Sequence, residues 1–96
     1  MTRDEVLTIL RQHKNELEER FGIEEIALFG SFARNEATRN SDIDLAILKM
    51  RKKSYWTLLD AISYLSERLD RKVDAGFYDA IRPFVRKRIE KEMVRV

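Results

Sequence analysis

The sequence lacks cysteine and contains one histidine, one proline and three glycines among its 96 residues. Without cysteine, disulfide bonds and cysteine-based metal sites are excluded. The single histidine, His13, has no second histidine to pair with, so we interpret it as a packed or half-exposed residue rather than a catalyst. There are no internal repeats, low-complexity tracts or linkers rich in glycine and proline.

The sequence also lacks a signal peptide and any apolar run long enough to span a membrane, so the cytoplasm is the expected location. Hydrophobic residues make up 44% of the chain and charged residues 38%, which is typical of a globular protein with a polar surface. We expect residues 1–96 to form one domain with a modest core.

The formal net charge is only +2, but basic residues are concentrated near the C-terminus. In this segment only Glu90 and Glu92 oppose Arg82, Arg86, Lys87, Arg88, Lys91 and Arg95. Local basicity of this kind favours triphosphate binding or a docking surface. It is weak evidence for duplex nucleic acid, which we do not expect as a partner.

Two aspartates separated by one apolar residue are the most informative feature that is present. Residues 42–48 are aliphatic and β-branched and predict a strand, whose period of two places Asp42 and Asp44 on one face. The core-facing positions are then Ile43, Leu45 and Ile47. At a spacing of roughly 6.5 Å, two ionised carboxylates would repel by about 3 kcal/mol at an effective dielectric constant near 20. A divalent cation would relieve that repulsion, and hard oxygen ligands favour magnesium or manganese. The alternative is a solvated strand end.

A second strand-like run, residues 25–29, leads into Gly30-Ser31 and then to Arg34. Glycine permits close backbone approach, serine adds a hydroxyl, and amides at the start of a following helix could hold phosphate oxygens. Taken alone, a Gly-Ser pair after a strand is usually only a turn. Arg34 could meet a triphosphate through its guanidinium, or it could make a surface ion pair.

A third acid, Asp74, lies in a segment where Val73, Ala75 and Phe77 alternate with polar residues and glycine. This alternation predicts that Asp74 points away from the core. If this strand neighbours the one that bears Asp42 and Asp44, the three carboxylates meet on one sheet face. The intervening segment is long enough to allow either strand direction.

The remaining segments predict helices. Thr2 to Glu5 fits a capping box at the start of a helix that Gly22 can terminate. Ser54 can cap a second helix, and Pro83 stands near the start of a third, which a short strand could follow at residues 94–96. In the second helix we expect an apolar packing stripe formed by Trp56, Leu59, Ile62, Leu65 and Leu69. We therefore expect an α/β (α+β) fold, a small mixed sheet with helices on one face and the acidic site on the other.

The combination of these motifs resembles the minimal nucleotidyltransferase (MNT) family of the DNA polymerase β superfamily, which includes MntA-like antitoxins of HEPN/MNT systems. The resemblance rests on Leu28 to Arg34, on Ser41-Asp42-Ile43-Asp44-Leu45 and on Val73-Asp74, and it extends over most of the chain. Members often have glycine where this sequence has Asn35, and an aliphatic residue where it has Ala75 or Gly76. These departures affect loop details and leave the acidic residues intact.

The resemblance implies a polymerase-β-like nucleotidyltransferase core that transfers AMP from ATP and releases pyrophosphate. Asp42, Asp44 and Asp74 would be the catalytic and metal-binding residues, holding two Mg²⁺ ions, with Mn²⁺ as a substitute. Gly30, Ser31 and Arg34 would bind the nucleotide phosphates.

The resemblance also implies a partner, because minimal members are commonly encoded beside a helical HEPN-type ribonuclease and act as its antitoxin. The expected acceptor is a hydroxyl of that toxin, a tyrosine in some members, within a hetero-oligomer. Two alternatives remain at this point: a non-catalytic module that neutralises the toxin by occlusion, and transfer to RNA or a small molecule.

Overall fold

The computed structural model describes all residues from Met1 to Val96 and is built around one four-stranded mixed sheet. The strand order is β3-β2-β1-β4, in which β2 and β3 are parallel and the other two pairs are antiparallel. The strands are β1 Ile23–Phe29, β2 Ile43–Met50, β3 Val73–Phe77 and β4 Val94–Arg95. The predicted fold class, with a small mixed sheet, is therefore confirmed.

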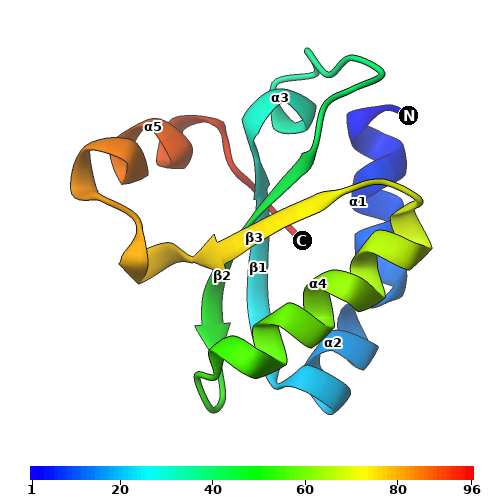
Figure 1. The fold of residues 1–96 in the computed structure, drawn as a ribbon. Helices are drawn as coiled ribbons and strands as arrows, with labels where there is room; N and C mark the ends of the chain where they lie inside the picture. The colour runs from blue at the N-terminus through cyan, green and yellow to red at the C-terminus, as the bar shows by residue number, and fades with distance from the viewer.

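Three of the five α-helices gather on one side of the strands, whereas the last helix stands on the other side (Figure 1). The first group is α1 Arg3–Gln12, α2 Lys14–Phe21 and α4 Tyr55–Leu69. The short α3, Gly30–Ala33, follows β1 directly, and α5, Pro83–Glu92, follows a 3₁₀ turn at Tyr78–Ala80. None of the helices is both long and apolar enough to cross a membrane.

The core lies between the sheet and the α1, α2 and α4 layer. Ile43 and Leu45 are fully buried, as the alternation along β2 predicts, and they belong to a cluster of 19 buried residues. On the opposite face, Ala27 and Ala46 are buried as well, and so is Ile89 of α5, but all three lie outside that cluster. Burying an isoleucine side chain contributes about 2 kcal/mol. Helix α5 is therefore a smaller second covering, on the side of the sheet that bears Asp44.

The N-terminal helix has the predicted capping box, in which Thr2 and Glu5 exchange hydrogen bonds, and Gly22 ends α2 in the left-handed conformation. The helix is interrupted at His13, which caps the end of α1 and the start of α2. Nδ1 of His13 lies 3.1 Å from the hydroxyl oxygen of the buried Tyr64. His13 is thus a partly buried structural residue, as the sequence indicated.

The predicted stripe on α4 is wrong at its N-terminal end. Trp56 is 79% exposed and Leu59 is 38% exposed. The buried residues of this helix are Leu58, Ala61, Tyr64, Leu65 and Leu69. Apolar residues surround much of the helix, and packing against the sheet selects the face that contains Leu58 and Leu65.

Candidate active site

The sheet register brings Asp44 directly beside Asp74. These two residues are partners in the parallel β2–β3 pair, and neighbouring strands lie about 4.8 Å apart. Asp42 comes one residue before β2 and is half-buried, while Asp74 is exposed. The predicted adjacency of the two acidic strands is confirmed, and their direction, which the sequence left open, is parallel.

The environment of Asp44 raises the pKa of its carboxyl group to about 6. Burial is the largest cause, and the negative charges of Asp74 and Asp42 add to it. Asp42 also approaches a cation, since its Oδ2 lies 3.8 Å from Nζ of Lys72. The charges of Asp42 and Asp74 therefore act on Asp44 at the end of the sheet where β2 and β3 begin, which we call the acidic edge.

Gly30 lies against Asp44 at the point where β1 ends. Its φ angle is +78°, a left-handed conformation that side chains disfavour. A Cβ atom on Gly30 would lie 2.2 Å from Oδ2 and 3.0 Å from Cγ of Asp44. Glycine is therefore required at position 30 both by the positive φ angle and by the close approach of Asp44. The Gly-Ser turn and the acidic strand are thus in direct contact.

A hollow of about 350 Å³ opens at this contact. Strand β2 contributes Asp44, and the Gly-Ser turn contributes Gly30, Ser31 and Arg34. Phe29 and four residues of α5 complete its wall: Val85, Arg88, Ile89 and Glu92. The hollow therefore brings together four of the six predicted site residues, while Asp42 and Asp74 lie outside its lining.

Glu92 of α5 is a residue of this site that the sequence reasoning missed. Its Oε2 accepts a hydrogen bond of 2.6 Å from the backbone N–H of Gly30, and both carboxylate oxygens lie 3.1 Å from Nη1 of Arg34. Nε of Arg34 also donates to Glu36 at 2.9 Å, and Glu36 and then Glu92 raise the pKa of the guanidinium. Gly30 N–H and Arg34 thus already hold an anionic group, which supports their suitability for phosphate oxygens.

Comparison with known proteins agrees with this geometry. Residues 10–96 match the family described as the nucleotidyltransferase domain. The chain belongs to that family. The enzyme class that the motifs predicted, a nucleotidyltransferase, is confirmed.

Similar proteins match this nucleotidyltransferase over nearly its whole length. A proposed protein adenylyltransferase from Methanocaldococcus jannaschii is 42% identical over 99% of this chain and 98% of its own. The protein adenylyltransferase MntA from Thermococcus cleftensis is 34% identical over 100% of this chain and 97% of its own.

Among solved structures, that of a proposed minimal nucleotidyltransferase superimposes with a TM-score of 0.80 at 26% identity, covering 100% of this chain and 97% of the other. A toxin–antitoxin structure with AMP-PNP has a TM-score of 0.70 at 21% identity, covering 99% of this chain and 72% of the other, and it supports the fold alone.

The acidic edge of this nucleotidyltransferase does not form a complete cation site from protein side chains. No group of three or more acidic or histidine side chains is gathered closely enough to hold a metal ion by itself. The donor chemistry nevertheless fits a hard divalent cation, because the carboxylates supply oxygen ligands. Burial and then the charges of Asp74 and Asp42 raise the pKa of Asp44, and a cation would offset those charges. Water or substrate oxygens would complete the coordination.

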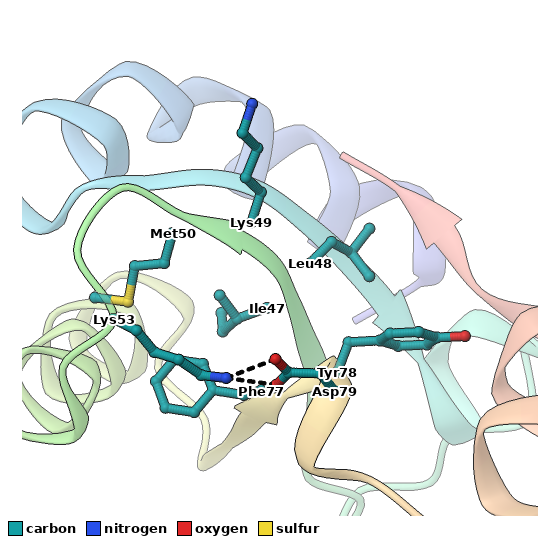
Figure 2. A pocket seen from close by; sticks show the side chains of 8 residues that line it. All are labelled: Ile47, Leu48, Lys49, Met50, Lys53, Phe77, Tyr78 and Asp79. Carbon is teal, nitrogen blue, oxygen red and sulfur yellow. Dashed lines mark hydrogen bonds and ion pairs between the residues drawn. The ribbon is translucent and has the colours of Figure 1, made fainter. Parts of the chain in front are cut away.

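A second hollow, of about 260 Å³, lies at the other end of β2 (Figure 2). Here Nζ of Lys53 lies 4.8 Å from the ring centre of Phe77 and donates to both oxygens of Asp79, at 2.6 and 2.7 Å. Figure 2 shows Lys49 and Tyr78 pointing away from this ion pair. Lys53 and Asp79 neutralise each other, so we do not assign a role in the reaction to this second hollow.

Proposed function

We propose that this nucleotidyltransferase transfers AMP from ATP to a hydroxyl group of a partner protein, a tyrosine of a helical HEPN-type toxin, and thereby acts as an antitoxin. The observation that carries the proposal is the packing of Gly30 against Asp44, which puts the Gly-Ser turn and an acidic strand at one hollow. The names of the similar adenylyltransferases support protein as the acceptor.

The nucleotide fits this hollow through its phosphates. The N–H of Gly30, the hydroxyl of Ser31 and the guanidinium of Arg34 are the groups that bind the outer phosphate oxygens. The first and last of these groups hold the Glu92 carboxylate in the structure, so they are oriented toward an anion. ATP is the proposed nucleotide, and AMP-PNP in a structure of the same fold is consistent with that choice.

Two Mg²⁺ ions, replaceable by Mn²⁺, are part of the proposal, and Asp42, Asp44 and Asp74 would hold them. When bound, these ions would offset the charge on the triphosphate and lower the pKa of the acceptor hydroxyl. The acidic edge would keep the acceptor and the α-phosphate together, which reduces the entropic part of the barrier.

In the transfer step, the acceptor oxygen forms a bond to the α-phosphorus and the bond from that phosphorus to the bridging oxygen breaks. Pyrophosphate leaves with that oxygen and its electron pair, and AMP stays on the acceptor. The hydroxyl proton passes to Asp74 or to solvent. A carboxylate that binds a metal ion is a poor base, which favours solvent as the proton acceptor. The acceptor enters from a partner, so the working unit is a hetero-oligomer, which we place in the cytoplasm.

The decisive experiment is intact-mass spectrometry of the protein encoded by the neighbouring gene. It is incubated with this nucleotidyltransferase, ATP and MgCl₂, and the Asp44→Asn variant serves as control. We expect mass increments of whole AMP units with the wild type and none with the folded variant. Wild-type rates in Asp44→Asn would refute the role of the acidic strand.

The same experiment tests the occlusion alternative. An unchanged mass alongside a stable complex would refute AMP transfer and favour a non-catalytic antitoxin. In that case the Asp42→Asn/Asp44→Asn variant would protect RNA from the partner as well as the wild type does.

A further inference from the structure

Helix α5 has an outward surface that no other part of the chain covers. We call it the α5 rim; it consists of Phe84, Val85, Lys87, Arg88 and Lys91, all of them exposed. Phe84 is 76% exposed, a large fraction for a phenylalanine, and Val85 is 40% exposed. Exposed apolar residues together with basic ones are typical of a protein interaction site.

The other side chains of α5 fasten this helix to the sheet side. Ile89 is buried, the hydroxyl of Tyr78 donates a hydrogen bond to Glu90, and Glu92 binds Gly30 and Arg34. Arg86 lies over the ring of Tyr78, 5.7 Å from its centre. The α5 rim is therefore presented on a fixed support, and none of its members is needed for these contacts.

The charges of the rim are not neutralised within the chain. Lys87, Arg88 and Lys91 take part in no ion pair, although nine ion pairs form elsewhere. At the other exposed aromatic site, around Trp56, two of the three neighbouring cations are neutralised, because Arg51 pairs with Glu18 and Lys53 pairs with Asp79, and only Lys52 is in no ion pair. Unpaired cations beside apolar side chains fit an acidic partner better than a neutral one.

The rim also adjoins the candidate active site. Val85 and Arg88 belong to it, and both line the same hollow as Asp44. Trp56, in contrast, is at the beginning of α4, near the end of β2 that is remote from Asp44 (Figure 1). A segment that lies on the rim would reach the hollow with the next few residues of its chain.

We propose that the α5 rim is the docking surface for the acceptor protein, and that it binds an acceptor segment with apolar and acidic residues next to the modified hydroxyl. This inference rests on the proposed function. Phe84 and Val85 bind the apolar residues of the acceptor, Lys87, Arg88 and Lys91 bind its acidic residues, and the hydroxyl enters the hollow near Asp44.

The probe is a fluorescein-labelled peptide in which one tyrosine is flanked by leucines and then by acidic residues. Its counterpart has lysines in place of the acids. Fluorescence anisotropy without ATP measures the binding of each peptide to the wild type, to Phe84→Ala and to Lys87→Glu/Lys91→Glu. The matched control is Trp56→Ala/Lys52→Glu, which removes an equally exposed aromatic residue and a lysine from the remote site.

We expect the wild type to prefer the acidic peptide and Phe84→Ala to weaken its binding about tenfold, equivalent to about 1.4 kcal/mol. The charge reversal at Lys87 and Lys91 should invert the preference, and the control variant should bind as the wild type does. Equal binding of the two peptides, or equal losses in the control and rim variants, would overturn the docking proposal.

A parallel mass assay of the neighbouring-gene product separates this proposal from the proposed function. Rim-dependent peptide binding without any AMP transfer would refute the transfer and leave the docking surface supported. AMP transfer that Phe84→Ala and Lys87→Glu/Lys91→Glu leave unchanged would refute the docking surface and leave the transfer supported.

Discussion

The carboxylate of Asp44 fills the space that a side chain at Gly30 would occupy. This contact joins two motifs that are 14 positions apart in the sequence, and it makes the shape of the Gly-Ser turn depend on the acidic strand. A change at either residue therefore affects the other.

Replacing Gly30 with alanine should abolish nucleotidyl transfer and destabilise the fold. The new methyl group would meet Asp44 at 2.2 Å, and φ of +78° adds backbone strain of about 1–3 kcal/mol. Urea unfolding measures the stability, and the intact-mass assay of the neighbouring-gene product measures the transfer. Gly76→Ala is the control, because a Cβ atom there has no neighbour within 4 Å. Equal stability of the two variants would contradict the predicted clash.

Removing the charge of Asp44 should stabilise the protein near neutral pH. The pKa of this carboxyl is about 6 in the folded protein and about 3.8 when unperturbed, so the folded state holds the proton more tightly. Its favourable contribution is present below pH 4 and is lost as the pH rises through 6. Because Asp44 is only partly buried, we expect Asp44→Asn to gain about 1 kcal/mol at pH 7 and nothing at pH 4.

Urea unfolding at both pH values, in the presence of EDTA to exclude divalent cations, measures this difference in stability. The variant should be inactive throughout. A lower stability than wild type at pH 7 would mean that the ionised Asp44 carboxylate is a net stabilising group.

Neutralising Glu92 should strengthen ATP binding. Its carboxylate holds the N–H of Gly30 and the guanidinium of Arg34, the groups to which we assign the outer phosphates. Glu92→Gln keeps the shape of the side chain and removes the charge that repels the triphosphate. We expect the Kd of ATP, measured by calorimetry with MgCl₂, to fall about fivefold.

The control for Glu92→Gln is Glu90→Gln, since Glu90 bonds to Tyr78 and does not line the hollow. A higher Kd in Glu92→Gln would assign Glu92 the opposite role, that of holding Arg34 in place for the nucleotide.

Adding Mg²⁺ should raise the melting temperature, and EDTA should reverse the effect. A cation at the acidic edge offsets the repulsion among Asp42, Asp44 and Asp74. At ten times its Kd it stabilises the folded state by about 1.4 kcal/mol, equivalent to about 5–10 °C for a domain of this size. Thermal unfolding in NaCl of matched ionic strength is the control. An equal shift in Asp42→Asn/Asp74→Asn would place the cation elsewhere.

The acidic strand and the Gly-Ser turn could be predicted from residue patterns within short segments of the sequence. Alternation along residues 42–48 correctly separated Asp42 and Asp44 from the buried Ile43, because the two faces of a strand follow from backbone geometry. The same kind of reasoning failed for Trp56. An apolar residue at helical spacing is buried only if another element covers it, and no element covers the side of the first turn of α4 that bears Trp56.

The sequence by itself determined the family, the elements that bear Gly30, Asp44 and Asp74, and the separation of the two aspartates from the core. These properties depend on spacing within short segments. Tertiary structure alone decided the parallel register that sets Asp44 beside Asp74, and the contact of Glu92 with Gly30 across 62 positions. Such contacts depend on how the whole chain closes its loops and packs its helices, which no pattern within a single strand or helix specifies.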